Sequence, residues 1–549
     1  MDGLMMDFQL TLPAILRRAD TYYGAKEIVS REPDRSLHRY SYRQMAERAK
    51  RLAAALQSLG VKPGDRVATL AWNHHQHLEA YFGAPLSGGV LHTLNLRLHP
   101  TDLAYIINHA DDQVILIDDV LWPLFEAVRG AIHPKHVVVF SHPGSPPINR
   151  GGTLDYEELL ASASIADFAY PEFDEYQAAA LCYTSGTTGR PKGVLYSHRS
   201  VVLHSFATAL TSPASIGELD TVMPVVPMFH VNAWGMPFTA TMMGAEQVFP
   251  GPYLDGASLL ELLDCEKVTL SCGVPTLWLG VLQLLDKEPG RYDLSQLKAL
   301  LSGGQAAPES MIRGFLERHG VHVYQGWGMT ETAPVAAVCY SPNEQGELTQ
   351  DQKYGYLTKH GRPLPFVEMR VRNGDSIAPW DGATMGELEV RGPWVAASYY
   401  DMPEAADQFT DDGWFRTGDI ATIDELGYME IRDRLKDVIK SGGEWISSLA
   451  LENALMGHPA VAEAAVVAVP DPRWLERPVA VIVLREGQSA TDDELRAFLA
   501  PTFAKWWLPD AFEFRDSIPR TSTGKFQKSA LRDELAPKYE QMKSEQPAS

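Results

Sequence analysis

The chain has 549 residues, which is too many for a single hydrophobic core. Its residues are 45% hydrophobic and 21% charged, and this composition is typical of a folded globular protein rather than a disordered one. Its 48 Lys and Arg stand against 70 Asp and Glu, and the resulting net charge of −22 disfavours binding to nucleic acid or to anionic membrane surfaces. The 4 cysteines form no C-x-x-C pair, so we expect neither a disulfide framework nor a zinc knuckle, and a reducing, cytoplasmic location fits best.

Two segments bear on targeting. Asp2 and Asp7 stand where a secretory leader requires positive charge, and the segment lacks a long apolar core. The stretch Thr221–Ala245 has no charged side chain and resembles a membrane span, but its three prolines would leave backbone groups unsatisfied in lipid. We therefore interpret it as buried strand and loop around a pocket, and expect no integral membrane segment.

Strand-like and helix-like segments alternate along the first part of the chain. A helix is predicted at Tyr42–Leu59, with its apolar residues on one face and Gly60 as its stop, and a buried strand follows at Arg66–Trp72. Further short apolar runs predict strands at Val114–Ile117, His136–Phe140, Val222–Val226 and Val268–Cys272. This alternation predicts an α/β fold with largely parallel sheets.

The pattern changes near Met369 to short strands and turns. Beyond Lys436 the sequence predicts a compact α+β unit with helices at Ser448–Met456 and Asp492–Leu499, and a strand at Glu463–Val469. We place a domain boundary near Arg434–Asp437, which predicts domains at 1–434 and 435–549.

The segment Tyr183–Gly193, YTSGTTGRPKG, follows an apolar strand-like run. Its glycines allow close approach of backbone to a ligand, its hydroxyls and N–H groups suit phosphate oxygens, and Lys192 adds positive charge. It lacks the Gly-Lys-Ser/Thr step of a Walker A loop. A flexible solvated turn is the alternative, although turns seldom carry this composition directly after a buried strand.

This segment resembles the phosphate loop of the adenylate-forming enzymes, which include acyl-CoA synthetases, luciferases and peptide-synthetase adenylation domains. Five further segments are similar to that family's motifs and occur in the same order along nearly the whole chain. They are PMFH with VNAWG (227–235), SGGQAAP (302–308), YQGWGMTET (324–332), TGD with DRLKDVIKSGGEWIS (417–419 and 433–447), and PRTSTGKFQK (519–528). The resemblance implies a large N-terminal AMP-binding domain of stacked sheets with a distorted β-barrel, and a small mobile C-terminal domain.

The resemblance also implies roles for individual residues. Lys525 would reach the carboxylate and the α-phosphate during adenylation, Thr330 would bind the α-phosphate, and His230 would contact the carboxylate. Glu331, with Thr184, would hold Mg²⁺ on the ATP phosphates. Without the family, Lys525 is more typical of a solvated lysine and His230 of a structural histidine, while Glu331 is equally typical of a helix-capping glutamate.

Nucleotide binding is expected from a larger set of residues, in which Trp327 would lie against adenine and Asp419 and Arg434 would hold the ribose. Away from the family, Trp327 is also typical of core, and Asp419 of a plain turn. The full set is Thr184, Ser185, Gly186, Thr187, Thr188, Gly189, Lys192, Gly303, Gly304, Gln305, Gln325, Gly326, Trp327, Thr330, Asp419 and Arg434.

An apolar acyl pocket is expected around Val231, Trp234 and Gly326, where no Arg or Lys could neutralise a second carboxylate. Lys436 matches the family's hinge position, about which the C-terminal domain would rotate between half-reactions. Residues Lys440, Gly442, Gly443 and Trp445 would contact CoA or nucleotide.

The resemblance is closest to the medium- and long-chain fatty-acyl-CoA synthetase branch, which also contains ligases for short thioether acids such as methylthiopropionate. We therefore expect an ATP- and Mg²⁺-dependent fatty-acid–CoA ligase. The alternatives are an enzyme that loads a carrier protein's phosphopantetheine and a non-catalytic acyl or nucleotide binder. We expect small-molecule substrates as partners, no nucleic acid, and a homodimer.

Overall fold

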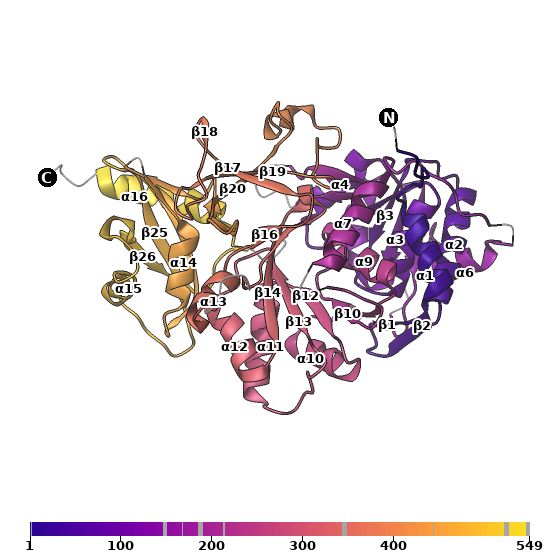
Figure 1. Ribbon diagram of the computed structural model, residues 1–549, viewed down its shortest axis with the longest axis horizontal. Coiled ribbons are helices and arrows are strands. Elements are labelled where there is room, and N and C mark those ends of the chain that lie inside the picture. The colour runs from indigo at the N-terminus through magenta and orange to yellow at the C-terminus, as the bar shows by residue number, and fades with distance from the viewer. Residues whose placement is uncertain are drawn as a thin grey trace. The chain divides into compact units, whose positions relative to one another are not determined.

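The structure, a computed structural model, describes residues 1, 3–145, 151–166, 168–184, 190–211, 215–342, 348–442, 444–520 and 526–544. The chain divides into two compact units. Unit 1 comprises Met1–Glu368 and Arg391–Phe415, and unit 2 comprises Met369–Val390 and Arg416–Ser549. Figure 1 follows the chain from the indigo N-terminus to the yellow C-terminus.

Unit 1 contains a nine-stranded sheet with the strand order β16-β15-β14-β13-β12-β10-β11-β1-β2. Its middle strands, from β14 to β1, pair in parallel, whereas β2, β15 and β16 pair antiparallel. The strands are β1 (Glu27–Arg31), β2 (Leu37–Ser41), β10 (Thr221–Pro224), β11 (Glu246–Phe249), β12 (Leu270–Gly273), β13 (Ala299–Gly303), β14 (His322–Gly328), β15 (Val335–Val338) and β16 (Arg362–Pro363).

A seven-stranded sheet with the order β7-β6-β5-β3-β4-β8-β9 completes the strands of unit 1. It is parallel except for the final pair, in which β9 runs antiparallel to β8. The strands are β3 (Arg66–Leu70), β4 (Val90–Thr93), β5 (Asp112–Asp118), β6 (His136–Phe140), β7 (Leu154–Asp155), β8 (Ala178–Tyr183) and β9 (Gly193–Ser197).

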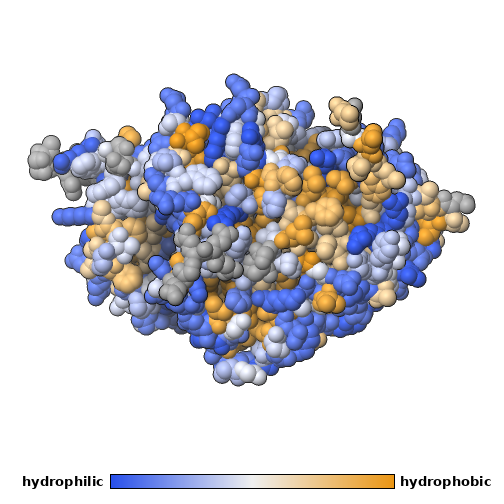
Figure 2. Space-filling view, in the orientation of Figure 1, coloured by the Kyte–Doolittle hydropathy of each residue, from blue (hydrophilic) through white to orange (hydrophobic). Residues whose placement is uncertain are grey.

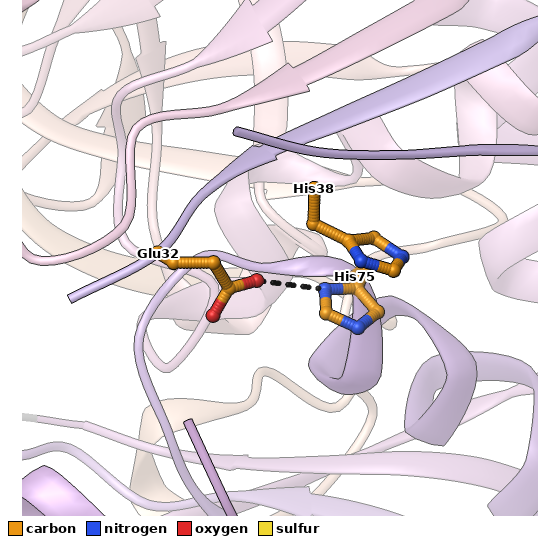
Figure 3. Close-up of side chains that lie close together, drawn as sticks. All are labelled: Glu32, His38 and His75. Atoms are coloured by element: carbon orange, nitrogen blue, oxygen red, sulfur yellow. Dashed lines mark ion pairs between the residues drawn. The ribbon is translucent and has the colours of Figure 1, made fainter. Parts of the chain in front are cut away.

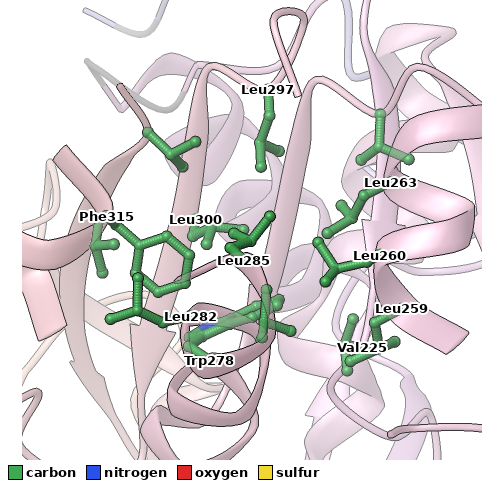
Figure 4. Close-up of a cluster of buried hydrophobic side chains, with 14 of the residues drawn as sticks. Val225, Leu259, Leu260, Leu263, Trp278, Leu282, Leu285, Leu297, Leu300 and Phe315 are labelled. Carbon is green, nitrogen blue, oxygen red and sulfur yellow. The ribbon is translucent and has the colours of Figure 1, made fainter. Parts of the chain in front are cut away.

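Helices lie between most of the parallel strands of unit 1, because parallel neighbours need long connections. They are α1 (Leu12–Tyr22), α2 (Tyr42–Ser58), α3 (His75–Leu86), α4 (Pro100–Ala110), α5 (Trp122–Val128), α6 (Tyr156–Ser162), α7 (His198–Leu210), α8 (Val231–Trp234), α9 (Met236–Met243), α10 (Gly256–Cys265), α11 (Pro275–Lys287), α12 (Glu309–His319) and α13 (Gln350–Leu357). Figure 4 shows the core that α10, α11 and α12 form against the nine-stranded sheet around Trp278, whose Nε1 donates to the Leu301 carbonyl at 3.1 Å.

Unit 2 contains two five-stranded sheets. The first, with the order β18-β17-β19-β20-β21, is built from β17 (Glu368–Asn373), β18 (Ser376–Ile377), β19 (Gly386–Arg391), β20 (Phe415–Ile423) and β21 (Met429–Arg434). The second has the order β23-β22-β25-β24 with β26 paired to β25, and its elements are β22 (Ile439–Ser441), β23 (Glu444–Ile446), α14 (Ser448–Met456), β24 (Val461–Asp471), β25 (Leu475–Leu484), α15 (Asp492–Leu499), β26 (Ala511–Phe514) and α16 (Lys528–Ser544).

The predicted α/β class is confirmed, and most predicted elements are found within two residues of the expected bounds. The strand His136–Phe140 and the helices Ser448–Met456 and Asp492–Leu499 have the predicted bounds. Both helices begin at a capping hydroxyl, since Ser447 accepts from the Ala450 N–H and Thr491 forms a capping box with Glu494. The region of short strands is the open sheet from β17 to β21 in the described residues.

None of the helices in the described part of the chain combines the length and the apolar composition of a bilayer-spanning segment. The stretch Thr221–Ala245 contains the predicted strand as β10, but the prediction of loop for the rest was wrong, because α8 and α9 follow. Figure 2 shows apolar residues gathered right of the centre of the viewed face, with hydrophilic residues around the rim.

Candidate active site

Most of the predicted site residues of unit 1 follow the carboxyl ends of neighbouring parallel strands. His230 and the 231–235 segment come after β10, Gly303–Gln305 come at the end of β13, and Thr330 and Glu331 come after β14. Open parallel sheets bind ligands outside the carboxyl ends of their strands. The predicted motifs, separated by about a hundred residues of sequence, therefore meet at one edge of the sheet.

The predicted phosphate loop joins two antiparallel strands, β8 and β9. Its base is held by two hydrogen bonds, from the Thr184 N–H to the Lys192 carbonyl at 2.9 Å and from the Lys192 N–H to Thr184 Oγ1 at 3.0 Å. The central residues of the loop lie outside the described residues, namely Ser185, Gly186, Thr187, Thr188 and Gly189. The Lys192 ammonium lies 4.7 Å from the centre of the Tyr399 ring, which directs its charge toward that aromatic face.

Two tyrosines hold the predicted α-phosphate and metal residues. The Tyr399 hydroxyl donates to Glu331 Oε1 at 2.6 Å, and the Tyr196 hydroxyl donates to the Thr330 carbonyl at 2.6 Å. Glu331 is only 5% exposed and Tyr399 8%. Burial and the nearby Glu331 carboxylate raise the pKa of Tyr399, so the phenol stays protonated as a donor. A buried, hydrogen-bonded carboxylate is a hard oxygen ligand, and Glu331 fits the expected Mg²⁺ in that respect.

The segment after His230 forms a left-handed turn. Val231, Asn232, Ala233 and Trp234 have φ values of 46°, 51°, 49° and 58°, and Gly235 continues at 73°. Each L-residue in this conformation costs about 1–2 kcal/mol, so tertiary contacts must hold the turn. The Asn232 side chain supplies some of them, because its Oδ1 lies 3.3 Å from Thr93 Oγ1 and 3.4 Å from Cys182 Sγ.

The left-handed turn brings Trp234 to the predicted acyl pocket. A methyl group on Gly303 would lie 2.9 Å from Trp234 Cη2 and 3.1 Å from the Gly326 carbonyl, so the indole rests against these two glycines. Trp234 also packs against a buried apolar cluster. That cluster consists of Ile216, Val222, Val226, Met236, Ala240, Ala245, Leu270, Cys272 and Ala299. The structure therefore brings Trp234 to Gly303 and Gly326, and the role of Val231, Trp234 and Gly326 in binding an acyl group stays a prediction.

Gln325 is among the residues expected to bind the nucleotide, but its side chain forms hydrogen bonds within the protein instead. Its Oε1 accepts from the Ala307 N–H at 2.5 Å, and its Nε2 donates to the carbonyls of Thr358 and Lys359. These bonds tie the 303–308 loop to β14. Trp327 is 7% exposed and lies on the same face of β14 as Gln325, whereas Gly304 is exposed and Gln305 half-buried in the loop.

A histidine that the sequence did not single out lies behind the turn. His204, on α7, accepts the Val335 N–H at Nε2 (3.1 Å), and a methyl group on Gly235 would lie 2.8 Å from its Nδ1. Burial lowers the pKa of His204 to about 3, so the ring is neutral. His204 therefore contacts both Val335, at the start of β15, and Gly235, at the end of the left-handed turn.

In unit 2 the two predicted ribose residues face each other across a strand pair. Asp419 on β20 and Arg434 on β21 are direct partners in the register, and Arg434 Nε lies 2.8 Å from Asp419 Oδ1. The carboxylate is buried, while the arginine side chain is 42% exposed. The Asp419 N–H donates to Thr417 Oγ1 within β20, where Gly418 has a φ of 68°.

The predicted hinge and CoA residues lie close together in unit 2. Lys436 is exposed in the turn after β21. Lys440 and Trp445 are paired across the β22–β23 hairpin, whose turn contains Gly442. A methyl group on Gly442 would lie 2.8 Å from the Trp474 ring. Gly443 lies outside the described residues.

Lys525 also lies outside the described residues, but the segments beside it are held. Arg520 and Phe526 form an antiparallel bridge, and the Gln527 N–H donates to the Pro519 carbonyl at 2.7 Å. The buried Lys528 ammonium lies 2.6 Å from Glu452 Oε1. The 521–525 segment therefore starts and ends at one point of unit 2.

Sequence reasoning did not identify Tyr399, Tyr196 or Asn232 as supports of the site. Tyr399 lies 68 residues from Glu331, and Tyr196 lies 134 residues from Thr330. No periodicity or local motif signals such contacts. Asn232 stands inside a recognised motif, and a polar residue flanked by apolar ones in a buried segment was its available signal.

Comparison with known proteins agrees with the family that the sequence motifs resemble. Residues 16–400 match the family model described as AMP-binding enzyme, and residues 450–525 match its C-terminal domain. The chain is 50% identical over 539 residues to a long-chain-fatty-acid–CoA ligase of Thermus thermophilus, with 97% of each chain covered. It is 45% identical to a 3-methylmercaptopropionyl-CoA ligase of Ruegeria lacuscaerulensis (97% and 98% covered) and 42% identical to a medium-chain-fatty-acid–CoA ligase of Ectopseudomonas oleovorans (97% of each).

Solved structures agree on the fold. The anthranilate CoA ligase AuaEII in complex with anthranoyl-AMP superimposes with a TM-score of 0.85 at 25% identity, covering 98% of this chain and 100% of that chain. ATP-bound MatB from Rhodopseudomonas palustris superimposes with a TM-score of 0.82 at 26% identity, covering 97% and 100%. Both comparisons span both units.

Proposed function

Because this chain belongs to the AMP-binding enzyme family, we propose that it joins a fatty acid to CoA in two steps, with ATP as the energy source. The first step makes acyl-AMP and pyrophosphate, and in the second the CoA thiol displaces AMP. The chain is an enzyme of the acid–thiol ligase class, and its substrates are an acid, ATP and CoA. The observation that supports the proposal is the contact of Tyr196, on β9 beside the phosphate loop, with the Thr330 carbonyl, together with the packing of Trp234 against Gly303 and Gly326 on the sheet that carries Thr330.

In the proposed first step the carboxylate oxygen attacks the α-phosphorus of ATP, and pyrophosphate leaves. Negative charge on the phosphate oxygens is stabilised by Lys192, by Thr330 and by Lys525. Mg²⁺, when bound to the ATP phosphates, supplies further charge neutralisation, and Glu331 would hold it with Thr184. Tyr399 is a positioning residue, because its hydroxyl orients the Glu331 carboxylate.

Asp419 and Arg434 would hold the ribose and the phosphate side of the nucleotide. A carboxylate accepts two hydrogen bonds from a diol, and the 2.8 Å contact with Arg434 orients Asp419 for this purpose. Gly303, Gly304 and Gln305 would leave space beside adenine, with Trp327 next to them. Gln325 supports that loop through its contacts with Ala307 and Thr358.

For the second step we propose that the C-terminal domain (435–549) rotates about Lys436 and replaces Lys525 with the β22–β23 hairpin. The hairpin carries Lys440, Gly442, Gly443 and Trp445, and small residues there allow pantetheine to pass close to backbone. His230 would contact the carboxylate in the first step.

We propose a medium- or long-chain aliphatic acid as the substrate. Support comes from the uncharged apolar cluster against which Trp234 packs and from the names of two relatives at 50% and 42% identity. A short thioether acid is the second candidate, because a relative at 45% identity is named as a 3-methylmercaptopropionyl-CoA ligase. Both acids are apolar beyond the carboxylate.

The test is pyrophosphate release from ATP and Mg²⁺ across straight-chain acids of increasing length, with 3-methylmercaptopropionate included, each with and without CoA. We expect sustained turnover that requires CoA and has a maximum at one chain length. A single burst unaffected by CoA would instead indicate a carrier-protein acceptor, and no release with any acid would contradict the proposal.

We also propose that the enzyme is a cytoplasmic homodimer. All four cysteines are free thiols, which suits a reducing compartment. Apolar side chains near the N-terminus are exposed to solvent, from 62% for Phe8 to 94% for Leu4, and would gain from a partner's surface. Light scattering at micromolar concentration distinguishes a dimer from a monomer.

A further inference from the structure

A cluster of histidines and carboxylates lies in unit 1, among residues to which the proposed reaction assigns no role. Glu32 follows β1, His38 is on β2 and His75 is the first residue of α3. One potential ligand atom from each of the three lies within 4.8 Å of the others. Figure 3 shows the Glu32 carboxylate pointing toward the His75 ring, with the His38 ring stacked on it.

Two of the facing atoms are buried and have no hydrogen bond. Glu32 Oε1 and His75 Nδ1 are 3.4 Å apart, and neither has a hydrogen-bond partner among the residues that the structure describes. Glu32 is 3% exposed and His75 6%. A buried polar atom without a partner is costly, so a pair of them aimed at each other calls for an explanation.

The separation of these two atoms matches a shared metal ion. Ligands at about 2.0–2.1 Å from a tetrahedral zinc lie roughly 3.3–3.4 Å from each other. A direct hydrogen bond would be shorter, at about 2.7–2.9 Å between a charged pair. The observed 3.4 Å therefore fits two ligands of one ion better than a donor and its acceptor.

The other oxygen of Glu32 is held from behind. His142 Nδ1 lies 2.9 Å from Glu32 Oε2, and His142 Nε2 lies 3.2 Å from Asp118 Oδ1. These contacts orient the Glu32 carboxylate and leave its Oε1 directed at His75. Metal sites use such second partners to orient their ligands.

The chemistry of the three side chains indicates which cation they would bind. Two imidazole nitrogens with one carboxylate oxygen favour Zn²⁺ over Mg²⁺ or Ca²⁺, which prefer oxygen ligands.

An access route is present as well. His38 lines a surface cavity of about 410 Å³, whose wall also contains Arg48. The Arg48 guanidinium contacts both Glu79 and Glu157, so its charge is compensated. A cation from solvent can reach His38 through this cavity, and a water molecule from it can complete the coordination.

We propose that Glu32, His38 and His75 form a binding site for a zinc-like divalent cation that ties the β1–β2 hairpin to the start of α3. The His38 and His75 rings are stacked at 3.9 Å with planes 13° apart, so their lone pairs do not converge in this arrangement. Coordination requires the His38 ring to tilt out of the stack, and its partial exposure at the cavity allows this.

A neighbouring cluster does not support the same proposal. His74, Asp118 and His142 also lie close together, but His74 Nε2 is 2.7 Å and His142 Nε2 3.2 Å from Asp118 Oδ1. Hydrogen bonds already satisfy these atoms. The cluster of His74, Asp118 and His142 contacts the proposed metal ligand Glu32 through His142, but it is not itself proposed to bind a metal.

The test measures zinc bound per chain without ATP or Mg²⁺, using full-length protein treated with chelator and then dialysed against Zn²⁺. A Cys265→Ser background removes the exposed thiol, which could take up zinc. His38→Ala is the test variant, because His38 is partly exposed and its loss leaves the Glu32–His142 contact intact. His322→Ala is the matched control, since His322 is an exposed histidine stacked on Tyr324.

We expect one zinc ion per chain fewer in His38→Ala than in the parent and in His322→Ala, and loss of a zinc-dependent rise in melting temperature. Acyl-CoA formation should be equal in all three, which shows that the variants are folded. Cobalt substitution should give a visible ligand-field band only where His38 is present. Equal zinc binding by His38→Ala and the parent, or no zinc bound by the parent, would overturn the proposal.

Discussion

Removal of one hydroxyl, in Tyr399→Phe, should weaken the use of Mg²⁺ in adenylation. The Tyr399 hydroxyl donates to Glu331 Oε1 at 2.6 Å, and both side chains are buried. A hydrogen bond to a charged group contributes about 1.5–3 kcal/mol, and its loss leaves the buried Glu331 carboxylate less well oriented. This energy corresponds to about a 10- to 150-fold fall in kcat/KM for pyrophosphate release.

The assay is pyrophosphate release at saturating acid and ATP while the Mg²⁺ concentration is varied. We expect the half-saturating Mg²⁺ concentration to rise by about tenfold or more in Tyr399→Phe. The reaction of supplied acyl-AMP with CoA should be unchanged, because it needs no phosphate-bound metal. Separation of the two half-reactions distinguishes an effect on Glu331 from general damage.

Tyr196→Phe is a matched control for this prediction. Its hydroxyl also donates at 2.6 Å, but to the neutral carbonyl of Thr330. This variant should lose about 0.5–1.5 kcal/mol of stability and keep the Mg²⁺ dependence of the parent. Equal shifts of the Mg²⁺ dependence in the two variants would refute the reasoning that Tyr399 acts through the Glu331 carboxylate.

Three more predictions concern other parts of the site. Lys525→Ala should abolish acyl-AMP formation yet leave thioester formation from supplied acyl-AMP largely intact, and equal loss of both would remove its assigned role. Gly303→Ala should displace Trp234, because its Cη2 would lie 2.9 Å from the new methyl group, and this should raise KM for the acid. A rise in KM for ATP alone would instead place Gly303 at the nucleotide. The pKa of His204 is about 3 in the folded chain and about 6.5 in the unfolded chain. The contribution of this neutral ring to the free energy of unfolding is therefore fully present above pH 6.5 and falls by about 2 kcal/mol by pH 5, because the unfolded chain binds the proton. Glutamine does not titrate, so the melting temperature of His204→Gln should fall less than that of the parent between pH 7 and pH 5. An equal fall in both proteins would contradict the assignment of this pH dependence to His204.

The sequence predicts elements well where local signals define both ends. The helix Asp492–Leu499 has a capping box at Thr491, and the strand His136–Phe140 is an apolar run between polar residues. The ribose pair Asp419 and Arg434 was also predicted, and the structure makes the two direct partners across a strand pair.

Contacts between distant segments were not predictable in this way. Nothing in the VNAW sequence, which has no glycine before Gly235, predicts a left-handed turn, because the conformation depends on Thr93 and Cys182 holding Asn232. The Tyr399–Glu331 contact has the same origin in tertiary packing. The placement of Lys525 stays a prediction.

The left-handed turn at 231–234 has a consequence for how this enzyme would respond to selection. Four residues at about 1–2 kcal/mol each store an amount of free energy similar to the 5–15 kcal/mol of net stability that is typical of a folded domain. Variants selected for heat resistance alone should therefore acquire substitutions that relax this segment, with Ala233→Gly among the simplest. Such variants would no longer present Trp234 against Gly303 in a fixed way, so thermal robustness and discrimination among acids would evolve in opposite directions.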